Sequence, residues 1–183
     1  GGGAFCKLLL RGRGASVGLS LAGFGLIFVG LDTLQAGMAT LGTRIDLARF
    51  AGDGFLARLA LAGVGLVMTV VMQSSSAAVA TSLAAVHGGT LTIEHAAAMV
   101  IGQNVGTTVT ALLGSVGGTV AARRIAAAHV LFNVGTGVVA LALFPAFVAL
   151  VVRVFGRSEP ALTVSGFHSV FNVLGVAIFL PLA

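Results

Sequence analysis

The chain has 183 residues, of which 57% are hydrophobic and only 8% are charged, and its mean hydropathy is +1.10. Soluble domains carry about 25% charged residues, so this composition excludes a soluble catalytic domain and indicates an all-α polytopic membrane protein. The net charge of +5 does not indicate a nucleic-acid partner, because the basic residues flank apolar stretches, and a single cysteine excludes a disulfide framework.

Five apolar segments follow a short start. Residues 1–14 hold basic residues among glycines and are expected to form an interfacial linker, and residues 15–183 are expected to form the transmembrane unit. Since about 20 apolar residues span a bilayer, we predict segments at about 15–41, 59–86, 91–120, 125–152 and 161–180. The chain begins without Met and ends directly after an apolar segment, so we expect a fragment of a longer protein.

The first segment contains Asp32, for which a structural position near the membrane interface is favoured over a cation site or proton relay. The third segment is expected to begin with Thr90 or Thr92 as the helix cap and Glu94 in the first turn. Arg123 and Arg124 mark the membrane surface before the fourth segment.

Two of these segments are interrupted by polar residues. Residues 73–76 read Gln-Ser-Ser-Ser, and residues 102–108 read Gly-Gln-Asn-Val-Gly-Thr-Thr. In a helix, the apolar residues 59–72 rise about 21 Å and residues 91–101 about 16 Å, so both runs are expected near mid-membrane. Irregular backbone at that depth must be buried in protein or line a watery cavity, and paired interrupted helices indicate a transporter's binding site. We therefore predict helix breaks and a site at both runs.

The topology of the interrupted segments has three readings. We favour a re-entrant hairpin over residues 59–86 with the serines at its tip, while full crossings, or a re-entrant third segment, stay open. The basic residues divide evenly between the two sides in each case, so the positive-inside rule gives no orientation.

The polar side chains in both runs are neutral groups that donate and accept hydrogen bonds, and can therefore hold an oxyanion as well as an alkali cation. Half-helices starting near Ala77 and Val109 would direct positive N-terminal ends at the breaks, and half-helices ending near Met72 and Ile101 would present carbonyl groups that suit Na⁺. Between Arg58 and Arg123 the only charged side chain is Glu94. A buried anion would therefore need a cation to accompany it, which predicts cation-coupled symport.

These residues resemble the type II sodium/phosphate cotransporters and their bacterial relatives. The similarity covers about 15–183 and rests on Gln-Ser-Ser-Ser-Ala at 73–77, on residues 102–110, on Ala-Arg-Arg at 122–124 and on two His-x-x-Phe-Asn elements. The resemblance implies one repeat of an inverted-repeat transporter, the C-terminal half of the membrane domain, which imports inorganic phosphate with Na⁺ across the cell membrane by alternating access. It implies no enzyme activity and no cofactor besides Na⁺ as the coupling ion.

Carried over by position, the resemblance assigns phosphate binding to Gln73, Ser74, Ser75, Ser76, Asn104, Thr107 and Thr108, and Na⁺ binding to Gln73, Ser75, Ser76, Asn104 and Thr107. No transition-metal site is expected. One departure is Gln103, which stands where the family usually has a small residue; this side chain either alters the site or faces another helix. The partners implied are phosphate, Na⁺, the lipid bilayer, and the missing first repeat or a second copy.

The element His129-x-x-Phe132-Asn133 recurs as His168-x-x-Phe171-Asn172, and we expect both asparagines to bond between packed helices. Three other functions are weighed against phosphate symport. Another small oxyanion or acid would suit the same site, and a non-transporting partner subunit is a second option. The third, an intramembrane serine protease, would need one of the serines at 74–76, or Ser165, within hydrogen-bond distance of a histidine.

Overall fold

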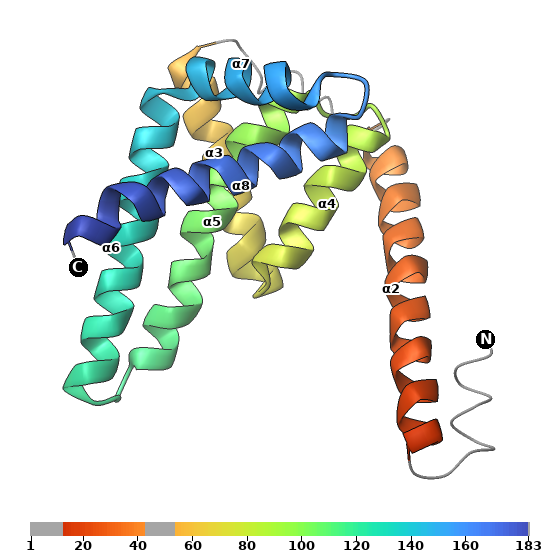
Figure 1. The fold of residues 1–183 in the computed structure, drawn as a ribbon, viewed down its shortest axis with the longest axis horizontal. Helices are drawn as coiled ribbons and strands as arrows, with labels where there is room; N and C mark the ends of the chain where they lie inside the picture. The colour runs from red at the N-terminus through yellow and green to blue at the C-terminus, as the bar shows by residue number, and fades with distance from the viewer. Residues whose placement is uncertain (1–12, 43–53, 183) are drawn as a thin grey trace.

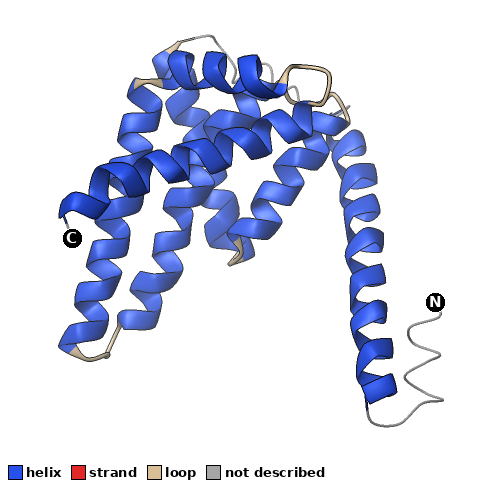
Figure 2. Cartoon of the chain, in the orientation of Figure 1, coloured by secondary structure: helices blue, strands red, loops and turns tan. Residues whose placement is uncertain are grey.

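The computed structural model of the chain describes residues 13–42 and 54–182, and every regular element within these ranges is a helix (Figure 2). The predicted all-α fold is confirmed. The elements are α2 (Arg13–Gly42), α3 (Phe55–Met72), α4 (Ser75–His87), α5 (Ile93–Ser115), α6 (Val120–Ala142), α7 (Phe144–Phe155), α8 (Pro160–Phe179) and the 3₁₀ turn η2 (Leu180–Leu182).

Helix α2 corresponds to the first predicted segment and stands at one side of the bundle, where it contacts α4 (Figure 1). Its described side chains include exposed large apolar groups such as Leu26 and Phe28. The side chain of Asp32 lies outside the described residues, as do residues 1–12 of the expected linker, so both expectations stay predictions.

The predicted interruption at residues 73–76 is a helix break. Helix α3 ends at Met72, the following Gln73 has a left-handed backbone with φ 51°, and Ser74 is extended with φ −153° before α4 begins. The two helices form a hairpin that points down between α5 and α2 in Figure 1. We call residues 73–76 the hairpin tip. At 1.5 Å per residue, the 13 residues of α4 rise about 20 Å, which is less than the bilayer core of about 30 Å.

The second predicted break was wrong, because α5 runs without interruption from Ile93 to Ser115. Its start agrees with expectation: the Thr92 side chain accepts a hydrogen bond from the His95 N–H at 3.1 Å. Neither a half-helix ending near Ile101 nor one starting near Val109 exists. The polar run 102–108 is therefore two turns of a regular helix and contributes no helix ends.

Close packing explains why this glycine-rich, polar run stays helical. A Cβ on Gly102 would clash with the backbone of Ala62 in α3, and one on Gly106 would lie 2.7 Å from the Cβ of Thr69. On the α3 side, Gly65 meets the backbone of Met99 in the same manner. Small residues that let two backbones approach closely are typical of helix pairs in membranes, so these glycines serve the α3–α5 contact.

The fourth predicted segment was also wrong as a single helix. It consists of α6 and α7, which meet at Leu143, just before Pro145. Proline has no N–H to donate and its ring would clash with the carbonyl four residues earlier, so α6 cannot continue. Helix α7 then lies across one end of the bundle, and α8, which corresponds to the fifth segment, crosses α5 and α6 obliquely (Figure 1).

Four described helices are long and apolar enough to cross a membrane: α3, α5, α6 and α8. Of these, α5 is the most buried, with 56% of its most apolar window inside the bundle, so it is the central helix. The largest buried side chains include Phe167 and Phe171 of α8, which belong to the same apolar core as residues of α4, α5 and α7. The hairpin tip is thus carried by helices that pack against a fixed central element.

Candidate functional site

The hairpin tip is built by two helix ends that meet. The side chain of Gln73 donates from Nε2 to the Val70 carbonyl at 2.6 Å, which satisfies one of the last carbonyls of α3. The Ser74 hydroxyl accepts the Ala77 N–H at 3.2 Å and caps α4. Gln73 and Ser76 are exposed, while Ser74 and Ser75 are half-buried.

The two helix ends give the hairpin tip an uneven charge distribution. The N-terminus of α4 carries a partial positive charge and offers backbone N–H groups near Ser75 and Ser76, which suits an anion. The C-terminus of α3 carries a partial negative charge and presents carbonyl groups near Met72, which suits a cation. Of the expected half-helices, the two of this hairpin are present.

The hairpin tip reaches α5 through Thr110, whose hydroxyl donates to Gln73 Oε1 at 3.4 Å. Our sequence-based site omitted Thr110. It follows Gln103 by seven residues, which is two turns of a continuous helix. This spacing places both residues on the same side of α5 and could have identified Thr110 from the sequence. The expected break in this run concealed that relation.

Asn104 lies in a different cluster. Its Nδ2 group donates to Asn133 Oδ1 at 2.8 Å and to Asn172 Oδ1 at 3.2 Å, which joins α5 to α6 and to α8. Asn133 and Asn172 in turn donate to the carbonyls of His129 and His168 within their own helices. The prediction that both asparagines bond between helices is confirmed.

The two threonines of the predicted site bond back to α5. Thr107 donates to the Gln103 carbonyl at 3.1 Å, and Thr108, which is buried, donates to the Val105 carbonyl at 2.7 Å. Within the described ranges, no hydrogen bond joins residues 73–76 to Asn104, Thr107 or Thr108. The predicted site residues of α5 thus bond within the bundle, and in the described part of the chain the link between α5 and the hairpin tip comes from Thr110 instead.

Gln103 faces another helix. Its side chain is 0% exposed, and its Nε2 group donates to the Ala78 carbonyl at 3.1 Å and to Ser82 Oγ at 2.7 Å, both in α4. Of the two readings of this residue, the contact with a neighbouring helix is the one observed.

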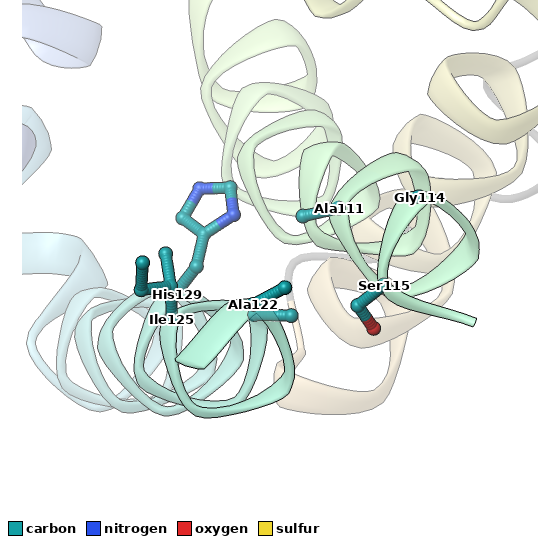
Figure 3. A pocket seen from close by; sticks show the side chains of 7 residues that line it. Ala111, Gly114, Ser115, Ala122, Ile125 and His129 are labelled. Carbon is teal, nitrogen blue, oxygen red and sulfur yellow. The ribbon is translucent and has the colours of Figure 1, made fainter. Parts of the chain in front are cut away.

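Besides a cavity of about 610 Å³ that residues of α3 alone line, two apolar cavities lie between helices of the bundle. One of about 340 Å³ opens between the ends of α5 and α6, where the His129 ring points toward Ala111 (Figure 3). Ser115 lines the same cavity, but its hydroxyl donates to the Leu112 carbonyl at 2.8 Å. The other, of about 350 Å³, lies between α3, α5 and α6. Neither has the paired polar groups of a site for a small ion.

Two of the four serines considered for a protease bond to backbone groups. Ser74 caps α4, and the Ser165 hydroxyl donates to the Ala161 carbonyl at 2.9 Å. A nucleophilic serine needs a histidine as its hydrogen-bond acceptor, so these contacts do not favour a protease.

Comparisons with known proteins point to transport. The sequence model of a family described as Na+/Pi-cotransporter matches residues 47–180. A curated relative from Bacillus subtilis (strain 168), the uncharacterized protein YqeW, is 31% identical over 169 residues, which is 91% of this chain and 53% of the relative. The chain thus spans about half the length of the curated relative that it matches. No solved structure matches the chain.

Proposed function

Because this chain belongs to the Na⁺/Pi-cotransporter family, we propose that the complete protein, a multi-pass membrane protein, carries inorganic phosphate into the cell together with Na⁺ by alternating access. The hairpin tip is the proposed centre of the site. The observation that carries the proposal is that the positive end of α4 and the carbonyl end of α3 meet at Gln73 and the three serines. An anion and a cation are thereby favoured at one place.

Charge supports the coupling to Na⁺. Arg58, at the other end of α3, lies over the Phe144 ring at 5.0 Å and is separated from Gln73 by about 22 Å of helix. No lysine or arginine lies between Arg58 and Arg123 in the sequence. A phosphate ion at the hairpin tip therefore receives no positive side chain from this stretch, and Na⁺ bound beside it would offset the cost of burying the anion.

We further propose that Ser74, Ser75, Ser76 and Gln73 contact phosphate, and that Gln73, Ser75 and Ser76 also contact Na⁺. Asn104, Thr107 and Thr108 would complete the site from α5. Because their donor groups are engaged within the bundle, a hydrogen bond from them to phosphate requires side-chain rotation, whereas their oxygen atoms can still accept or coordinate Na⁺. Thr110 joins the proposed site through its bond to Gln73.

Phosphate uptake into liposomes that contain the complete protein tests the proposal. We expect an inward Na⁺ gradient to drive uptake and replacement of Na⁺ by choline to abolish it. Uptake that continues unchanged in choline would contradict the coupling. Competition by excess arsenate and sulfate tests the substrate, because inhibition by sulfate as strong as that by phosphate would identify a transporter of oxyanions in general.

Two variants of Ser74 locate the anion. Asparagine and aspartate both cap helices as serine does, so Ser74→Asn and Ser74→Asp both retain the start of α4. Only the aspartate adds a negative charge. We expect Ser74→Asp to reduce uptake by about tenfold or more relative to Ser74→Asn, since about 1.4 kcal/mol of repulsion corresponds to tenfold. Equal uptake by both variants would place the anion elsewhere.

A further inference from the structure

The hydrogen bonds of the buried Gln103 side chain are not explained by packing alone. Its Nε2 group bonds to Ala78 and Ser82 of α4, whereas its Oε1 atom is buried without a hydrogen-bond partner among the described residues. The orientation of the amide is set by chemistry, because the Ala78 carbonyl can only accept a hydrogen bond. An unpaired buried acceptor is costly. An apolar or small residue would avoid that cost, so the two bonds to α4 must supply something that such a residue cannot.

The place of these bonds indicates what they supply. Ala78 is the fourth residue of α4, one turn after the serines at which this helix begins. Its N–H bonds to the Ser74 carbonyl at 3.0 Å, so Ala78 is tied directly to the hairpin tip. A side chain that holds Ala78 therefore also determines where the N-terminus of α4 lies relative to α5.

The other arm of the hairpin is held differently. Helix α3 contacts α5 along backbone approaches at Gly65, Gly102 and Gly106, which leave little room for movement. At the start of α4, Gln103 supplies the side-chain hydrogen bonds between this helix and α5 in the described part of the chain, and Thr110 bonds to the preceding Gln73. The position of the serines thus depends on a small number of polar contacts.

We propose that Gln103 is a positioning residue, which fixes the first turns of α4, and with them the serines of the hairpin tip, against α5. The inference rests on the proposed function, in which the hairpin tip binds phosphate and Na⁺. Gln103 touches neither ion. It acts through Ala78 and Ser82 by keeping the N–H groups of α4 in the orientation that the anion requires.

The test compares Gln103→Met and Ser82→Ala in the complete protein, in liposomes. Methionine has a similar shape but cannot donate, so both bonds are lost; alanine at position 82 removes one. We expect Gln103→Met to raise the KM for phosphate and the half-saturating Na⁺ concentration about tenfold, with the maximal rate within about twofold, and Ser82→Ala to raise both about threefold. The double variant should be no worse than Gln103→Met, because the two residues share one bond.

Thr136→Val is the matched control. Thr136 is buried in α6 and bonds to the Phe132 carbonyl of its own helix, so the substitution removes a buried hydroxyl without touching α4. We expect unchanged KM values. A purely structural role for Gln103 would lower the melting temperature and the maximal rate while leaving the KM values as they are, and that result would overturn the proposal.

Backbone hydrogen exchange separates this inference from the proposed function. The amides of Ala77 and Ala78 bond to Ser74, and we expect their exchange to rise about tenfold in Gln103→Met and less in Ser82→Ala. This readout holds even for a protein that shows no Na⁺-driven phosphate uptake. Unchanged exchange in both variants would refute the positioning role, whereas absent uptake by the unmodified protein would refute only the proposed transport.

Discussion

Three asparagines from three helices meet at Asn104, and each N–H of its amide group is used. One N–H donates to Asn133 Oδ1 and the other to Asn172 Oδ1. The recurring His-x-x-Phe-Asn element predicted that Asn133 and Asn172 bond between helices. It did not identify their common partner, because Asn104 is 29 residues from one and 68 from the other, and only the packing of α5 against α6 and α8 brings them together.

Asn133→Leu tests the energetic weight of this asparagine cluster. The substitution leaves one N–H of Asn104 without an acceptor inside the bundle, and we expect the free energy of unfolding to fall by about 1–2 kcal/mol. Thermal unfolding in detergent measures the change.

The control for this prediction is a double-mutant cycle with Asn104→Leu. Once both partners are apolar, no donor is left unpaired, so the loss in the double variant should be smaller than the sum of the two single losses. Additive losses would show that Asn104 and Asn133 do not interact in the folded protein.

Among the elements, α5 is where composition and packing oppose each other most clearly. Its run of glycine, amide and hydroxyl residues lowers the intrinsic preference for a helix. The close approach of Gly102 and Gly106 to α3 outweighs that preference. A polar run near mid-membrane therefore signals either a break or a buried helix face, and neighbouring helices determine which.

Gly102→Ala tests the α3–α5 contact. The added methyl group would clash with the backbone of Ala62, and backbone cannot rotate away as a side chain can. We expect the free energy of unfolding to fall by about 1–3 kcal/mol, measured by thermal unfolding in detergent.

Gly114→Ala, in the last turns of the same helix, is the matched control. A Cβ at Gly114 meets nothing within 4 Å, and alanine is favoured over glycine in helices by about 0.5–1 kcal/mol. This variant should be as stable as the unmodified protein or slightly more stable. Equal destabilisation by both alanines would mean that the glycines of α5 serve flexibility and not close packing.

For the whole molecule, the hairpin determines the topology. Both its outer ends, near Gly54 and Gly88, lie at the end of the bundle that carries α7, and the turn after α5 lies at the opposite end (Figure 1). With α4 too short to span the bilayer core, we propose that the hairpin is re-entrant, with its tip inside the membrane. The alternative of one continuous crossing by residues 59–86 would place Gly54 and Gly88 on opposite sides.

Cysteine labelling distinguishes these topologies. In the complete protein, with Cys6 and any other native cysteine replaced by serine, we expect a membrane-impermeant maleimide to label Gly54→Cys and Gly88→Cys from the same side and Val116→Cys from the other. Val116 is 80% exposed in the structure, which suits it as the reporter for the opposite surface. Labelling of positions 54 and 88 from opposite sides would disprove the hairpin topology.

The sequence alone determined that this protein is embedded in a membrane, that it is helical, and to which family it belongs. Hydropathy, the spacing of charges and short polar motifs are local properties of the chain. The sequence also located the helix break at residues 73–76, where four polar residues interrupt an apolar segment. Tertiary structure decided the rest. Whether α5 breaks, which helix Gln103 faces, and which residue joins Asn133 to Asn172 all depend on contacts between distant segments, whose energies no local pattern contains.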